Sequence, residues 1–452
     1  MSDARATILE LVRGYAGGDL SPVDVIADTL ERIDALDDRL SSYLEVRADG
    51  AMADARQLEG ELRRGRIRGP LHGVPVAVKD LIDVAGMATT GGSLLHRDNR
   101  PSADAEMVAT LRAAGAIIMG KNNLYEFGLG LPTDGEWPIA AKNPWDLSRI
   151  PGGSSSGSAV AAATGMCAGS FGTDTGGSIR GPASYCGVVG LKPTFGLIST
   201  TGCMALSWTL DHIGPMARTV DDAAALLAGA SGQPFELGTS VEGVRIGVPR
   251  SLLERVEIEA DVGRAFEEAL SVLQRVGATV QAIELPDLEL TEVALLAIIG
   301  SEGLAVHLPT LGHQPEAYGR SARERLSANL IYTGADYVNA LRARDVVIEE
   351  LDALYHGVDV IASPVTLQVA PTNVDFQRNP PHRTPFTGIH NLGGGPAVSV
   401  PCGFDRAGMP IGIQLAGPCD ADARVLSVAR AYERETPWHT AVPAVLQEIT
   451  AS

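Results

Sequence analysis

Apolar positions recur at helical spacing in some stretches of the chain and form short unbroken runs in others. Near the N-terminus, Ser21 followed by Pro22 is a typical helix start, and Ile26 and Ile33 then recur at helical spacing. A second helix with exposed charge is predicted from about residue 49 to residue 64. The unbroken apolar runs predict buried strands instead.

Helical patterns are followed at once by apolar strand patterns at several further places. One strand follows a turn after Leu71 and ends at Lys79. This alternation predicts the α/β class, with a central mixed β-sheet covered by helices. The expected helices are 105–114, 158–166, 262–276 and a final one over 422–434, and the expected strands are 116–119, 169–173, 278–283, 358–362, 397–400 and 411–415.

The organisation of the chain predicts one domain spanning residues 1–452. Its motifs are concentrated between about residues 70 and 220, and a more helical subregion is expected over about 234–370. No internal repeat is visible. Hydrophobic residues make up 45% of the chain, aromatic residues only 5%, and there are 51 glycines. A chain of this length can therefore bury a large core built from small side chains.

Charge and cysteine usage exclude several function classes. The net charge is −19 and no basic run is longer than Arg63-Arg64, so nucleic-acid binding is disfavoured. The five cysteines form no Cys-x-x-Cys pair, and the nine histidines show no metal-ligand spacing, so we expect reduced thiols and neither metal nor cofactor. No signal-peptide core and no apolar run of roughly twenty residues is seen, so we expect a cytoplasmic protein without a membrane contact.

Lysine is almost absent: the chain has four lysines against thirty-two arginines. All four lie in the same quarter of the sequence as its densest Gly/Ser stretch. Arginine stays protonated and cannot act as a base, whereas a desolvated lysine can lose its proton near neutral pH. The pattern alone could reflect codon bias, but beside serine-glycine loops it suggests serine chemistry driven by a lysine base. The lysines are Lys79, Lys121, Lys142 and Lys192.

The segment Thr175-Gly176-Gly177-Ser178 contains the strongest nucleophile candidate, Ser178. Two preceding glycines let the backbone approach a substrate closely, with N–H groups directed into a site. The amides of Thr175, Gly176, Gly177 and Ser178 could therefore stabilise a developing oxyanion. An ordinary Gly-Gly-Ser turn is the plainer alternative. Asp174 and Arg180 flank the loop, where a buried structural ion pair is expected.

A second serine, Ser154, lies in the glycine-flanked stretch 152–158. A serine hydroxyl is a poor nucleophile without a base, and no histidine or Gly-x-Ser-x-Gly elbow accompanies Ser154 or Ser178. No lysine has a serine three residues before it. Lys79 therefore remains as the base, with Ser154 available to carry a proton between Lys79 and Ser178.

A different motif has the spacing of a phosphate-binding loop but lacks its chemistry. Gly115 and Gly120 are followed by Lys121, yet the next residue is Asn122 where a serine or threonine would hold magnesium. The four intervening residues form an apolar strand pattern, so nucleotide binding is not expected.

Together these residues resemble the amidase signature family of serine hydrolases. The likeness covers nearly the whole chain, and an upstream lysine with two serines at this spacing is highly specific. The segments that carry it are Lys79, 152–157, 174–180, 186–194, 210–216, 391–401 and 410–415.

The resemblance implies the amidase signature fold and a Ser-Ser-Lys triad. In that triad Ser178 attacks an amide carbonyl, Ser154, on a cis peptide bond, relays its proton, and Lys79 accepts it. A seryl acyl-enzyme forms, ammonia or an amine leaves, and water releases the acid. The implied reaction cleaves linear carbon–nitrogen bonds other than peptide bonds in a small-molecule amide. The remaining lysines are interpreted as structural.

Three functions are compatible with the resemblance: a stand-alone amidohydrolase, the A subunit (the glutaminase) of a tRNA-dependent amidotransferase, and a catalytically inactive scaffold of the same fold. The complete triad disfavours the scaffold. His212 stands where such glutaminase components have glutamine, and Val346-Val347 stands near their glutamine-binding arginine. Asp420, by contrast, resembles their amine-binding aspartate. We favour the hydrolase, and the sequence leaves open a homodimer or a small partner subunit.

Five further side chains are candidates for the substrate pocket, although each is equally compatible with core or surface packing. They are Trp137, Trp208, Phe386, Ile389 and His390.

Overall fold

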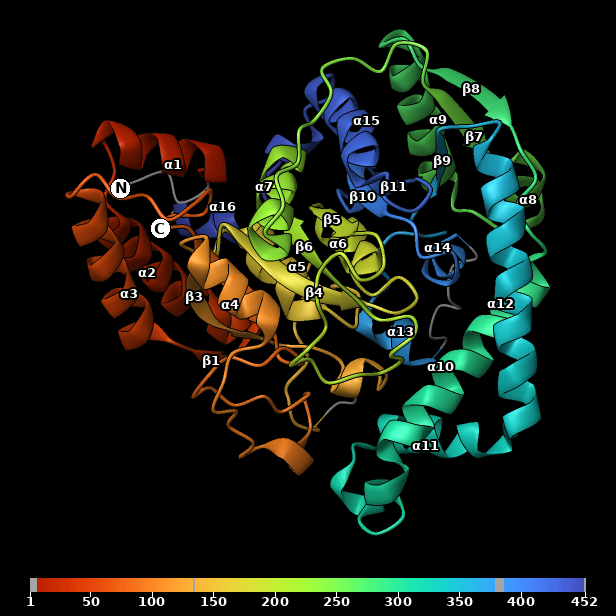
Figure 1. The fold of residues 1–452 in the computed structure, drawn as a ribbon, viewed down its shortest axis with the longest axis horizontal. Helices are drawn as coiled ribbons and strands as arrows, with labels where there is room; N and C mark the ends of the chain where they lie inside the picture. The colour runs from red at the N-terminus through yellow and green to blue at the C-terminus, as the bar shows by residue number, and fades with distance from the viewer. Residues whose placement is uncertain (1–5, 133–134, 379–385, 451–452) are drawn as a thin grey trace.

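A computed structural model describes residues 6–132, 135–378 and 386–450. An eleven-stranded mixed sheet runs through the whole molecule (Figure 1). This arrangement confirms the predicted α/β class with a central mixed sheet. In spatial order the strands are β1 (Tyr43–Val46), β3 (Ile117–Asn122), β2 (Pro75–Lys79), β4 (Gly169–Asp174), β6 (His212–Ala217), β5 (Val189–Lys192), β10 (Ala397–Phe404), β11 (Pro410–Ala416), β9 (Val360–Pro364), β7 (Arg245–Val248) and β8 (Thr279–Ala282).

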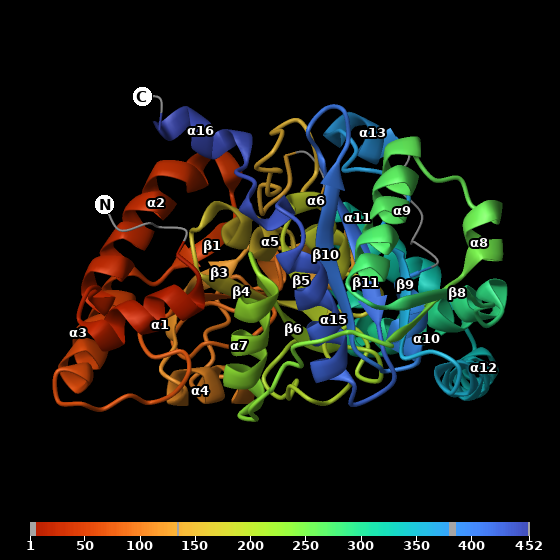
Figure 2. The same ribbon diagram turned by 90° about the horizontal axis from the view of Figure 1, so that it is seen from above.

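Helices cover both faces of this sheet (Figure 2). One apolar core joins the sheet to α1 (Ile8–Gly17), α4 (Glu106–Ala113), α7 (Val220–Ser231), α9 (Ala260–Arg275) and α15 (Asp422–Arg434). A second core joins it to α2 (Pro22–Leu40), α3 (Ala48–Leu62), α5 (Ser156–Thr164), α6 (Arg180–Cys186) and α16 (Ala444–Thr450). The short α8 (Arg250–Arg255) and α13 (Asn373–Arg378) also reach the first core, through Leu253 and Phe376.

A third core lies at one end of the molecule, where long helices pack against one another. Figure 1 shows α10 crossing α12, with α11 between their lower ends. This part of the chain is the helical subregion expected over about 234–370, and it also contributes β7, β8 and β9 to the common sheet. Its helices are α10 (Leu288–Leu311), α11 (Arg320–Ala328) and α12 (Gly334–Tyr355), and α14 (Gly388–Leu392) packs against α10 and α12.

Two sequence expectations were wrong. The helix over 422–434 is not the last one, because α16 follows it and packs Val445 and Leu446 into the second core. The second expectation was that the chain has no apolar run of roughly twenty residues. Helix α10 is long and apolar enough to cross a membrane by length and composition, with a mean hydropathy of 1.5. Half of the apolar stretch of α10 is buried inside the protein, as in an ordinary core helix.

Candidate active site

The ends of two neighbouring parallel strands place the candidate lysine and the nucleophile loop at the same edge of the sheet. Strand β2 ends at Lys79 and strand β4 ends at Asp174, and the two strands pair in parallel register. The carboxyl ends of parallel strands are where α/β proteins usually build their sites. The Gly/Ser loop that precedes α5 joins this edge, because the Ser155 amide donates to the Ser178 carbonyl at 3.2 Å.

Lys79 is fully buried and contacts Ser154. Its Nζ lies 2.8 Å from Ser154 Oγ and 2.7 Å from Thr173 Oγ1. Burial lowers the pKa of Lys79 to about 7, although the negative charges of Asp211 and Asp174 oppose this shift. A substantial fraction of Lys79 is therefore neutral near pH 7 and able to accept a proton.

Hydrogen bonds of the neighbouring backbone fix the position of Ser154. The Gly153–Ser154 peptide bond is cis, as the resemblance implied. The Ser154 carbonyl accepts a hydrogen bond from the Tyr125 amide at 3.1 Å. Ser155 anchors the loop to β4, because its hydroxyl donates to the Thr173 carbonyl at 3.1 Å. The Ser154 hydroxyl is thus fixed beside Lys79.

The loop that carries Ser178 is fixed from behind by the buried carboxylate of Asp174. This carboxylate accepts from the Gly177 amide at 2.7 Å and from the Ile179 amide at 3.1 Å. It also pairs with Arg180 at 2.9 Å, which confirms the ion pair expected from the sequence. Burial opposes ionisation of Asp174, but the charge and hydrogen bonds of Arg180 outweigh it and lower the pKa.

The buried guanidinium of Arg180 links the nucleophile loop to the C-terminal part of the chain. It donates to Asn391 Oδ1 at 2.7 Å, to Gln414 Oε1 at 2.8 Å and to the Thr387 carbonyl at 3.0 Å. A buried charge needs such partners to offset the loss of hydration. Arg180 is therefore a structural brace of the loop.

The four backbone amides proposed for an oxyanion hole differ in their surroundings. The Gly177 amide is already engaged by Asp174. Among the residues that the structure describes, the amides of Thr175, Gly176 and Ser178 have no protein acceptor. These three amides are therefore free to donate to a bound group.

Asp211 fixes the other side of the loop. It accepts the Thr175 hydroxyl at 2.6 Å and the amides of Leu206 and Ser207 at 2.8 and 2.9 Å. Burial raises the pKa of Asp211 to about 6, although these hydrogen bonds oppose the shift. Sequence reasoning quoted Asp211 within a motif but missed this contact.

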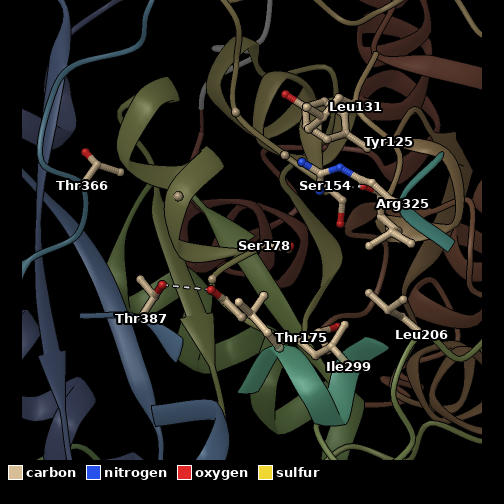
Figure 3. Close-up of a pocket in the computed structure, with 18 of the residues that line it drawn as sticks. Tyr125, Leu131, Ser154, Thr175, Ser178, Leu206, Ile299, Arg325, Thr366 and Thr387 are labelled. Atoms are coloured by element: carbon tan, nitrogen blue, oxygen red, sulfur yellow. Dashed lines mark hydrogen bonds between the residues drawn. The ribbon is translucent and has the colours of Figure 1, made fainter. Parts of the chain in front are cut away.

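Ser154 and Ser178 line one cavity of about 530 Å³ (Figure 3). Residues 175–178 and the glycines 152 and 153 line it as well. The remaining wall is largely apolar, and α10 and α11 contribute to it. Its larger side chains include Tyr125, Leu129, Leu131, Ile150, Leu206, Leu296, Ile299, Arg325 and Phe376.

The five pocket residues suggested by the sequence do not line this cavity. Trp137 and Trp208 are exposed at the surface, where 39% and 51% of each residue is accessible to solvent, and the other three are buried in the core. That suggestion was wrong because helices α10 and α11, distant in sequence from the motifs, supply the wall. The buried residues are Phe386, Ile389 and His390.

The positions compared with amidotransferase glutaminase components also lie outside the cavity lining. Val347 is buried in the third core and Val346 is exposed. Asp420 is exposed as well, so the geometry gives no support to an amine-binding role for it. His212 is buried, and its Nδ1 donates to the Leu210 carbonyl at 2.7 Å.

The other lysines occupy places away from Ser154. Lys121 is buried and pairs with Asp80 at 2.8 Å. Lys192 is buried and donates to the Gly395 carbonyl at 2.6 Å, and Lys142 is exposed. Within the described residues, no group of three or more His, Cys, Asp or Glu side chains is arranged to hold a metal ion.

Comparison with known proteins defines the class to which this fold and site belong. The Amidase family model matches residues 24–426, and the chain belongs to this family. It is 37% identical to the A component of the glutamyl-tRNA(Gln) amidotransferase of Anaeromyxobacter dehalogenans, over 95% of the chain and 96% of that protein.

Solved structures give the same result. A crystal structure of an amidase is 35% identical and superimposes with a TM-score of 0.88, covering 95% of this chain and all of that one. The peptide amidase of Stenotrophomonas maltophilia is 31% identical, with a TM-score of 0.83 and coverage of 96% and 98%. The amidase signature fold implied by the motifs is thereby confirmed.

Proposed function

We propose that this protein hydrolyses a small carboxamide to a carboxylic acid and ammonia or an amine, through a seryl acyl-enzyme. The observation that carries the proposal is the contact of buried Lys79 with Ser154 at 2.8 Å, because Ser154 in turn lines the same cavity as Ser178. A lysine with a pKa of about 7 can serve as a general base at neutral pH.

In the first half-reaction, Ser178 Oγ attacks the amide carbonyl carbon. Its proton passes to Ser154 Oγ as the Ser154 proton passes to neutral Lys79. The carbonyl oxygen becomes an oxyanion within reach of the free amides of residues 175, 176 and 178. The carbon–nitrogen bond then breaks, and the leaving nitrogen takes the proton back from Lys79 through Ser154.

The second half-reaction releases the acid. Water attacks the ester on Ser178, and the same two groups take its proton. When the Ser178–carbonyl bond breaks, that proton returns to Ser178 Oγ and the carboxylic acid leaves. Each cycle therefore consumes one amide and one water and restores the neutral Lys79.

A second candidate function is the glutaminase component of a tRNA-dependent amidotransferase, which would release ammonia from glutamine for a partner protein. The 37% identity to the Anaeromyxobacter protein favours it. Against it, the position compared with the glutamine-binding arginine of such components holds Val346 and Val347, which carry no positive charge and lie outside the cavity lining, although a different arginine, Arg325, lines the cavity. We therefore keep hydrolysis as the proposal and let the assay decide.

The test is ammonia release by the purified chain from a panel of amides: glutamine, short aliphatic and aromatic amides, and a peptide with a C-terminal amide. We expect turnover of a non-glutamine amide without tRNA, ATP or partner. Ammonia from glutamine alone, and only with a partner protein, would establish the second candidate. Cleavage of internal peptide bonds would contradict the restriction to non-peptide bonds.

A further inference from the structure

Two charged side chains line the cavity, and they differ in their surroundings. Glu292, on α10, is exposed to solvent. Arg325, on α11, is partly buried and lies on the side of the cavity near Ser154 and Tyr125 in Figure 3. A charged group that is partly withdrawn from water needs a counter-charge or hydrogen-bond acceptors.

Arg325 has few such partners in the protein. One N–H donates to the Leu129 carbonyl at 3.3 Å, a long hydrogen bond. Among the described residues, no carboxylate forms an ion pair with its guanidinium. The buried Arg180, by contrast, has Asp174, Asn391 and Gln414 as partners. Burial lowers the pKa of Arg325, the direction expected for a cation without a paired anion.

A second polar group in the same wall also has no partner. The Tyr125 hydroxyl is buried and no acceptor or donor is found for it in the described part of the chain. Tyr125 and Arg325 both line the cavity, next to apolar side chains such as Leu131. An unpaired buried polar group is costly, so this pair is prepared for a ligand that supplies acceptor oxygens.

We propose that the cavity takes amides that also carry a carboxylate, and that Arg325 binds this carboxylate with the Tyr125 hydroxyl as an additional donor. The inference rests on the proposed amidase function and specifies its substrate class. The planar fork of a guanidinium matches the two oxygens of a carboxylate. Within the described residues the lining has a single cationic side chain, which suits a monoanion better than a doubly charged phosphate.

The test compares an anionic and a neutral amide of similar size, succinamate and butyramide, through the ratio of their kcat/KM values. We expect wild type to prefer succinamate, and Arg325→Met to reduce the ratio by about tenfold or more, as for loss of a charge-assisted hydrogen bond. Arg325→Lys should give an intermediate ratio. The matched control is Arg320→Met, an exposed arginine on the same helix, which should keep the wild-type ratio.

A ratio near one in wild type, or a ratio that Arg325→Met leaves unchanged, would overturn the inference. Calorimetric titration of succinamate into Ser178→Ala, with and without Arg325→Met, makes the test independent of turnover. Tighter binding with Arg325 present supports the site, and equal affinity contradicts it. If no amide is hydrolysed, the proposed function fails, and this titration still decides the carboxylate site.

Discussion

Replacing Lys79 by arginine separates its positive charge from its capacity to accept a proton. With a pKa of about 7, roughly half of the wild-type Lys79 is neutral at pH 7. An arginine with a pKa above about 12 would be neutral in fewer than about one molecule in 10⁵ at that pH. The variant keeps the charge beside Ser154 and loses the base.

The expected loss follows from what a general base contributes. Such groups typically supply about 10²–10⁴-fold in rate, so Lys79→Arg should lower kcat/KM by about that factor, or about 3–5 kcal/mol of barrier. Lys79→Met should be similarly inactive. Because only neutral Lys79 accepts a proton, wild-type kcat/KM should fall about tenfold per pH unit well below pH 7 and level off above it.

The assay is ammonia release from the best amide between pH 5.5 and 9, together with thermal unfolding of each variant. Lys79 is fully buried, so the larger guanidinium should also cost about 1–3 kcal/mol of stability. Lys121→Arg is the control, because Lys121 is equally buried but pairs with Asp80 away from the cavity. Lys79→Arg activity within about tenfold of wild type, roughly 1.4 kcal/mol, would refute the base role.

Three further predictions concern the surroundings of Ser178. Ser154→Ala removes the hydroxyl that relays the proton to Lys79 in this mechanism, so kcat should fall by about 10²-fold or more in the ammonia assay. Gly177→Ala should lower both kcat and the unfolding temperature, because φ is +124° and a Cβ would lie 2.6 Å from Thr387 Oγ1. Asp174→Asn leaves the buried Arg180 charge unpaired and should destabilise the fold by about 3–5 kcal/mol in denaturant titration.

Each of these variants has a matched control. Ser184→Ala removes another buried hydroxyl, on α6, and should leave turnover intact. Gly263→Ala lies in α9, where an added Cβ meets nothing within 4 Å, and should be neutral. Asp261→Asn alters a surface ion pair and should change stability little. Equal effects in a variant and its control would contradict the specific reasons given.

Local patterning predicted most of the sheet and its covering helices, because apolar spacing directly reports which side chains are buried. Helix 422–434 was located to the residue, and the strand ending at Lys79 is β2. Strands β1, β5, β6 and β7 were not predicted. Each contains a charged residue, glycine or proline, so no unbroken apolar run marks it in the sequence.

The candidate site, like the fold, was predicted only in part. Motif spacing indicated Lys79, Ser154 and Ser178, and the fold brings the first two into contact and all three to one edge of the sheet. The cavity wall could not be predicted, because Arg325 comes from a helix far along the chain. Helix α11 is mostly polar and carries three arginines, so its sequence does not distinguish Arg325 from the other two.

Labelling with a fluorophosphonate probe, followed by mass-spectrometric mapping of the adduct, tests the central claim most directly. The probe reacts with an activated serine and does not depend on knowing the natural amide. We predict one adduct on Ser178 in wild type, none in Ser178→Ala, and normal labelling in Ser184→Ala. An adduct on another serine, or labelling that persists in folded Ser178→Ala, would contradict the assignment of Ser178 as the nucleophile.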